Sequence, residues 1–126
     1  MKENQKIKKY QSGNIETETY QDGETFVTKL FYNAKDAYVK ELSYLNDGVK
    51  KVKYYTEKGV LSKLDYFVDD KRHGLETKYF ISKNDGTVKS TKSYENGKLH
   101  GEKITYNEHG EVIKREIFDD GKPLPL

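Results

Sequence analysis

Aromatic residues and glycines return along this chain at nearly fixed spacing, and this regularity restricts the folds open to it. The clearest stretch begins at Tyr94 and reaches the next aromatic anchor, Phe118, after 24 residues. Between the two lie Gly97, Gly101, Tyr106 and Gly110, at offsets of 3, 7, 12 and 16 from Tyr94. A recurring unit of this length indicates small stacked motifs, because one such motif cannot bury enough apolar surface alone.

The same pattern can be followed towards the N-terminus. The aromatic anchors Tyr20, Tyr44, Phe67, Tyr94 and Phe118 are separated by 24, 23, 27 and 24 residues. They define four units, 20–43, 44–66, 67–93 and 94–117, with partial units at 10–19 and 118–126. A length of 126 residues suits one domain, so we expect residues 1–126 to form a single repeat domain.

Each half of a unit consists of a strand-like stretch followed by a turn. The turns are rich in Asn, Asp and Gly, as in NDG at 46–48, ENG at 95–97 and DDG at 119–121. These residues tolerate positive φ and favour tight hairpins. The stretches between turns are too short for helices and are rich in Thr, Val, Tyr and Ile. The sequence therefore predicts an all-β fold, an elongated antiparallel β-meander of tandem β-hairpins forming a single twisted or curved sheet.

Composition indicates a thin sheet without a second layer. Hydrophobic residues make up 33% of the chain and charged residues 35%, whereas aromatic residues reach 13% with 11 Tyr. Tyr covers apolar area and keeps its hydroxyl in water, so rows of aromatic rings across neighbouring strands are expected to hold the sheet. The two-residue period places Val112 and Phe118 on one face, with Lys114 and Glu116 between them.

The C-terminal half resembles the second type of MORN repeat. The matching residues are Tyr94, Gly97, Lys98, Gly101, Tyr106, Gly110, Phe118, Gly121 and Lys122. The unit from Phe67 has Asp70 where the first glycine belongs, and Val27 and Lys51 replace the second glycine in the earlier units. The chain is most similar to bacterial proteins of the YwqK antitoxin type. This resemblance implies a sheet of successive hairpins that binds a partner and has no catalytic residues.

No motif in the chain predicts catalysis, and we expect no enzyme activity, cofactor or metal. The chain has no Cys, no Gly-x-Ser-x-Gly and no phosphate loop. His73, His100 and His109 each precede a turn glycine, so their position in the repeat explains them better than metal binding does. Turn chemistry likewise explains the acidic pairs 69–70 and 119–120 better than an acid/base pair does.

Charge is nearly balanced, with 23 basic and 21 acidic residues, and this disfavours a dedicated nucleic-acid binder. Lysine runs at 50–53 and 6–9 could hold single-stranded nucleic acid next to exposed Tyr, but a solvated face that blocks edge pairing is the simpler interpretation. The sequence as written has no signal peptide, which favours the cytoplasm unless the chain is a trimmed secreted form.

A protein partner is therefore the favoured ligand, bound through a Tyr-rich face in the manner of an antitoxin, immunity protein or inhibitor. The candidate contact residues are Tyr32, Tyr54, Tyr55, Tyr79, Phe80 and Tyr106. In the pairs Tyr54–Tyr55 and Tyr79–Phe80, adjacent rings are expected on opposite faces. The alternative is a membrane- or envelope-associated structural repeat protein. The binding face, the partner and the oligomeric state stay open, and a dimer through a face or an edge strand is possible.

Overall fold

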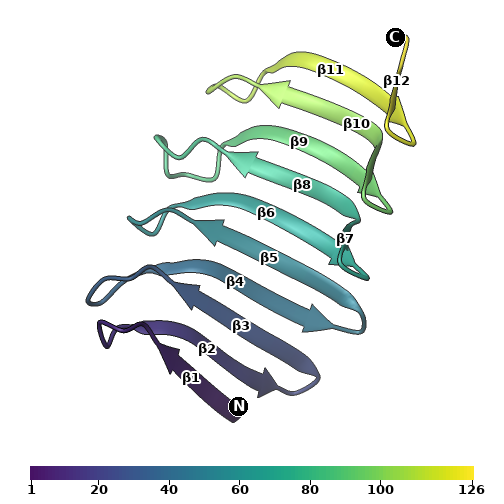
Figure 1. Cartoon of the computed structure of the whole chain (residues 1–126). Helices are drawn as coiled ribbons and strands as arrows, with labels where there is room; N and C mark the ends of the chain where they lie inside the picture. Colours follow the sequence, from purple (N-terminus) through teal and green to yellow (C-terminus); the bar gives the residue numbers. More distant parts are fainter.

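The computed structural model describes the whole chain, residues 1–126, as one antiparallel sheet (Figure 1). Its strands are β1 (Lys2–Lys9), β2 (Ile15–Asp22), β3 (Thr25–Phe31), β4 (Val39–Asn46), β5 (Val49–Tyr55), β6 (Leu61–Val68), β7 (Lys71–Arg72), β8 (Gly74–Tyr79), β9 (Val88–Glu95), β10 (Lys98–Tyr106), β11 (Val112–Asp119) and β12 (Lys122–Leu124). Strands pair in chain order, and only the short β7 lies off this path, paired with β6. The predicted all-β meander in a single sheet is confirmed.

Two-residue turns join the strands at one end of the sheet, here called the turn end (right in Figure 1). At Asp47–Gly48, Asn96–Gly97 and Asp120–Gly121, both residues have positive φ. That backbone matches the right-handed twist of the flanking strands, and Asn, Asp and Gly adopt it at the lowest cost. Asp69 and Asp70 form the same turn, with Asp70 at φ 62° in the position that glycine fills elsewhere. The interpretation of this acidic pair as a turn is confirmed.

Longer loops close the opposite end, here called the loop end. Three of them share one pattern of backbone hydrogen bonds. The first residue of the loop donates its N–H to the carbonyl of the residue four positions later, and its own carbonyl accepts the N–H of the glycine between them. The three loops are Tyr10–Asn14, Thr56–Val60 and Asn107–Glu111. The hydroxyl of Tyr10 also donates to the carbonyl of Phe31, and that of Tyr32 to the carbonyl of Tyr55. These bonds tie the first loop to the second and the second loop to the third.

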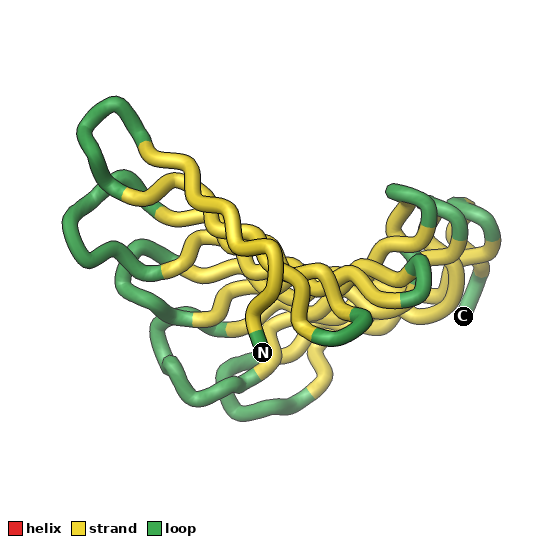
Figure 2. The backbone as a smooth tube through the Cα atoms, turned by 90° about the horizontal axis from the view of Figure 1, so that it is seen from below, coloured by secondary structure: helices red, strands yellow, loops and turns green.

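One extra residue interrupts the strand ladder close to the loop end in five successive hairpins. The extra residues are Glu16, Lys40, Ser62, Lys89 and Ile113. Such bulges bend a strand and increase its twist. Figure 2 shows the resulting sheet, which is strongly twisted and curved and is here called the trough. The bulge at Ile113 also interrupts the strict alternation predicted between Val112 and Phe118.

A second irregularity belongs only to the C-terminal hairpins. The expectation from the sequence that Gly74 and Gly101 lie in turns is wrong, because both lie within strands, at φ 94° and 101°. Beside them the backbone opens, so that Gly97 donates to the carbonyl of Arg72 and Gly121 to that of Leu99, at 2.8 and 2.7 Å. Each hairpin turn thereby bonds to the hairpin before it.

Little of this chain is buried, as a single layer requires. Only six of 126 residues are buried, and Val27 and Val52 are the only apolar ones. The accessible surface is 8524 Å², against about 6,900 Å² for a compact protein of this mass. Both faces are therefore open to solvent. The structure contains no helix, and so none that could cross a membrane.

The aromatic anchors are divided between the two faces of the sheet. Tyr44 lies between Val27 and Lys51 on one face. Phe67 pairs with Lys50 on the other face. A shift of one residue moves a side chain to the opposite face of a strand.

Candidate functional site

The face of the sheet that carries Phe26, Leu45 and Phe67 is here called the concave face, because a hollow lies on it. Three rows of side chains run across the strands on this face. Register places Phe26, Leu45, Lys50 and Phe67 in the row nearest the turn end. The middle row is Thr28, Ser43, Val52 and Asp65. The row nearest the loop end is Leu30, Glu41, Tyr54 and Lys63. The middle row has the smallest side chains, so a groove lies between the two rows of large ones.

A charged network closes this groove where it reaches β6. Asp65 on β6 and Glu76 on β8 are only 1% and 5% exposed, although they lie on the surface of a single sheet. The guanidinium of Arg72 lies 3.7 Å from each carboxylate. The ammonium of Lys63 is 3.5 Å from Asp65, and that of Lys92 is 4.0 Å from Glu76. Three cations thus surround two buried anions.

These ion pairs are long, and the buried carboxylates are poorly satisfied. A charge-assisted N–H···O bond usually measures about 2.7–2.9 Å. Both carboxylate oxygens of Asp65, one oxygen of Glu76 and Nε of Arg72 are buried without a hydrogen-bond partner. A buried charge without hydrogen bonds is costly. The network is therefore held by the attraction of its charges and not by short hydrogen bonds.

Aromatic rings surround the same network. The ammonium of Lys63 lies 4.4 Å from the ring centre of Tyr54. The guanidinium of Arg72 lies between the rings of Phe67 and Tyr94, 5.8 and 5.7 Å from their centres. Burial, followed by the charges of Asp65 and Glu41, raises the pKa of Tyr54 to about 12. The Tyr54 hydroxyl is therefore a neutral donor throughout the physiological pH range.

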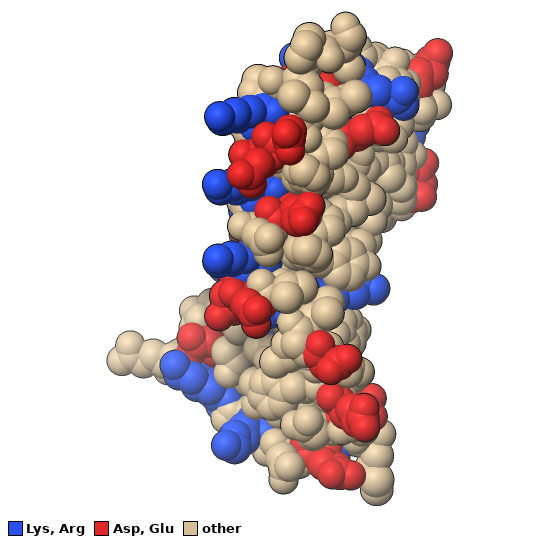
Figure 3. Space-filling model, turned by 90° about the vertical axis from the view of Figure 1, so that its right-hand side faces the viewer, with Lys and Arg blue, Asp and Glu red and all other residues tan.

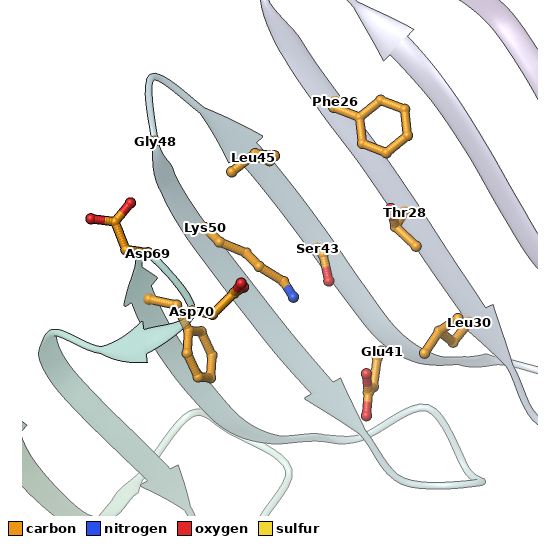
Figure 4. Close-up of a pocket in the computed structure, with 11 residues that line it drawn as sticks. Phe26, Thr28, Leu30, Glu41, Ser43, Leu45, Gly48, Lys50, Asp69 and Asp70 are labelled. Atoms are coloured by element: carbon orange, nitrogen blue, oxygen red, sulfur yellow. The ribbon is translucent and has the colours of Figure 1, made fainter. Parts of the chain in front are cut away.

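Beside the network the groove widens into a hollow of about 470 Å³, shown in Figure 4. Its apolar lining comes from Phe26, Leu30, Leu45 and Phe67. Thr28 and Ser43 form its floor, and Glu41, Lys50, Asp69 and Asp70 surround it. This volume lies within the range of sites that hold a small ligand or a side chain, about 300–1,000 Å³.

The six predicted contact residues do not form one surface. Tyr54 lies on the concave face, paired with Lys63, whereas Tyr55 and Tyr79 lie on the opposite, convex face. Burial and the neighbouring Tyr44 and Tyr66 raise the pKa values of Tyr55 and Tyr79, respectively.

The other three lie at the loop end. Tyr32 donates its hydroxyl to the carbonyl of Tyr55 and so has a structural bond. Phe80 follows β8, and Tyr106 ends β10. Their part in partner binding stays a prediction. Pattern reasoning missed Asp65, Arg72 and Glu76, because only the register of β6, β7 and β8 brings them together.

The convex face has its own buried carboxylate, Glu18, which is better satisfied. Burial opposes its ionisation, but hydrogen bonds from Gln5 and Lys2, together with the charges of Lys2 and Lys29, outweigh burial and lower its pKa. Glu18 therefore accepts hydrogen bonds from its own neighbours, whereas Asp65 and Glu76 on the concave face have ion pairs of 3.5–4.0 Å.

The three histidines and the lysines of 6–9 lie at exposed positions, whereas the lysines of 50–53 are half-buried. His100 lies 3.4 Å from Glu95 and 3.5 Å from Asp119, and its Nδ1 accepts the N–H of Asp120. No three His, Asp or Glu side chains form a group that could hold a metal ion. The lysines of 6–9 lie on the exposed edge strand β1. Figure 3 shows basic and acidic side chains interspersed along the turn end, without a continuous basic stripe on that side.

Comparison of the chain with protein-family models, with curated proteins and with solved structures gives no match.

Proposed function

We propose that this chain is a non-enzymatic protein-binding module of the antitoxin, immunity-protein or inhibitor kind, and that its partner lies on the concave face. The observation that carries the proposal is the groove, with its aromatic walls and a charged network whose carboxylates lack hydrogen bonds. Tyr and Arg side chains that converge at the centre of a concave surface are typical of the anchors of protein interfaces.

The shape of the molecule supports this use of the surface. A single sheet leaves both faces exposed, so a chain of 126 residues presents a broad surface. Strand pairing supplies 64 of the 76 backbone hydrogen bonds, so the trough is formed before any partner arrives. A preformed surface loses little conformational entropy on binding. The similarity of the C-terminal half to the second type of MORN repeat agrees with a partner-binding role.

Two leucines of nearly equal exposure allow a direct test of the binding face. Leu45 is 42% exposed on the concave face, and Leu75 is 44% exposed on the convex face. A photo-cross-linking amino acid placed at position 45 should capture a defined protein from the cells that make this chain, and the same group at position 75 should not. Leu45→Arg should abolish capture in solution, whereas Leu75→Arg should leave it unchanged. Equal capture from both positions, or none from position 45, would refute the proposal.

A further inference from the structure

The charges around the hollow are not balanced by the chain itself. Glu41, Asp69 and Asp70 contribute three negative charges and Lys50 one positive charge, a balance of −2. None of these three carboxylates has a basic side-chain nitrogen within 4.0 Å, so none of them forms an ion pair within the chain. The ammonium of Lys50 instead lies 5.7 Å from the ring centre of Phe67.

The apolar lining lies between these charges. Phe26 and Leu45 are 39% and 42% exposed, which is high for large apolar side chains that face each other across two strands. In Figure 4 their side chains lie on one side of the hollow with Leu30 across from them, while Asp69 and Asp70 lie beyond Lys50 and Glu41 lies beside Leu30. The site therefore offers an apolar centre with negative charge at two separate margins.

The groove also has the dimensions of an extended chain. It crosses β3, β4, β5 and β6, and strands about 4.8 Å apart give it a length of about 14 Å, or roughly four extended residues. A side chain at the centre of such a segment would enter the hollow, and its neighbours would reach the two acidic margins.

We infer that the concave hollow binds an extended peptide segment of the partner in which a large apolar side chain is flanked by Lys or Arg. The apolar side chain packs among Phe26, Leu45 and Phe67. The flanking cations pair with Asp69 and Asp70 at one margin and with Glu41 at the other. This inference rests on the proposed function and adds the chemistry of the segment that is recognised.

The test uses the full chain and three synthetic nonapeptides, followed by amide chemical shifts in ¹⁵N-labelled protein. One peptide has a central Phe between pairs of Lys, the second replaces Phe by Ala, and the third replaces Lys by Glu. The first peptide should shift the amides of Thr28, Ser43 and Leu45 saturably, with an affinity at least tenfold above that of the other two. The amide chemical shifts of Leu75 and Ser93, whose side chains lie on the convex face, should not change.

Protein variants separate charge from shape. Asp69→Asn with Asp70→Asn keeps side chains that tolerate positive φ, so the turn is retained while two charges are lost. This variant should bind the Lys-flanked peptide at least fivefold more weakly, and Leu45→Ala should weaken it similarly, whereas Leu75→Ala should not.

Equal binding of the Glu-flanked peptide, or shifts spread over both faces, would overturn the inference. So would a concentration-dependent dimer that Leu45→Arg dissolves, because a second copy would then occupy the groove. Failure of the peptides with successful cross-linking from position 45 would refute the peptide chemistry alone, whereas failure of both would refute the proposed function as well.

Discussion

Replacing Arg72 with Leu isolates the energetic role of the charged network. Leu is a suitable substitute because the next hairpin has Leu at the equivalent position. Arg72 pairs with the anchor Phe67, and Leu99 pairs in the same way with the anchor Tyr94. The new side chain therefore has a local precedent in the same fold. What the variant loses is the guanidinium that lies 3.7 Å from both Asp65 and Glu76.

The magnitude follows from the burial of those two carboxylates. Removing one partner of a buried ion pair costs about 3–5 kcal/mol. Asp65 keeps Lys63 at 3.5 Å and Glu76 keeps Lys92 at 4.0 Å, and the new Leu adds apolar burial. We therefore expect Arg72→Leu to lower the free energy of unfolding by about 2–3 kcal/mol. For a chain of 126 residues this corresponds to a fall in Tm of about 8–11 °C.

Thermal unfolding followed by circular dichroism measures this loss. Arg115→Leu is the matched control, because Arg115 pairs with Glu102 at 3.0 Å but both side chains are about half exposed, and such pairs contribute about 0–1 kcal/mol. Adding Asp65→Asn and Glu76→Gln to Arg72→Leu removes the unpaired charges and should restore at least half of the lost stability. A loss below about 1 kcal/mol, or no recovery in the triple variant, would refute the role assigned to Arg72.

Three further predictions concern backbone and side-chain chemistry. Gly101→Val should destabilise the chain by more than about 1 kcal/mol, and by more than Gly110→Val does, as measured by urea unfolding. A Cβ at position 101 would lie 3.2 Å from Cβ of Ser93, whereas a Cβ at position 110 would have no atom within 4 Å. Asp70→Gly should stabilise the chain by about 0.5–1 kcal/mol, since φ at this turn position is 62°, and unchanged or lower stability would contradict the turn assignment. The raised pKa of Tyr54, about 12, means that this phenol favours folding below its unfolded pKa near 10 and that the contribution disappears as pH rises through 12. Alkaline titration of tyrosine absorbance should lose its highest-titrating component in Tyr54→Phe, and an unchanged curve would contradict the burial assigned to Tyr54.

Local chemistry explains why the hairpins could be predicted from sequence. The turns depend on Asn, Asp and Gly at positions of positive φ, and these residues can be recognised without knowledge of the rest of the chain. Asp70 shows the limit of that rule, because a residue that breaks the glycine pattern still adopts the turn. The scarcity of aliphatic residues also correctly predicted a single layer.

The sequence by itself therefore determined the strands, their order and the thin sheet, since each depends on contacts between residues close in the chain. The tertiary structure alone decided on which face each aromatic ring lies, because a shift of one residue in the pairing register moves every side chain of a strand to the opposite face. Tyr44 and Phe67 occupy similar places in the pattern, yet they face opposite sides. Curvature likewise depends on bulges that have no fixed residue type. The network of Asp65, Arg72 and Glu76 lies within twelve residues, but only the register of β6, β7 and β8 places the three side chains together on one face.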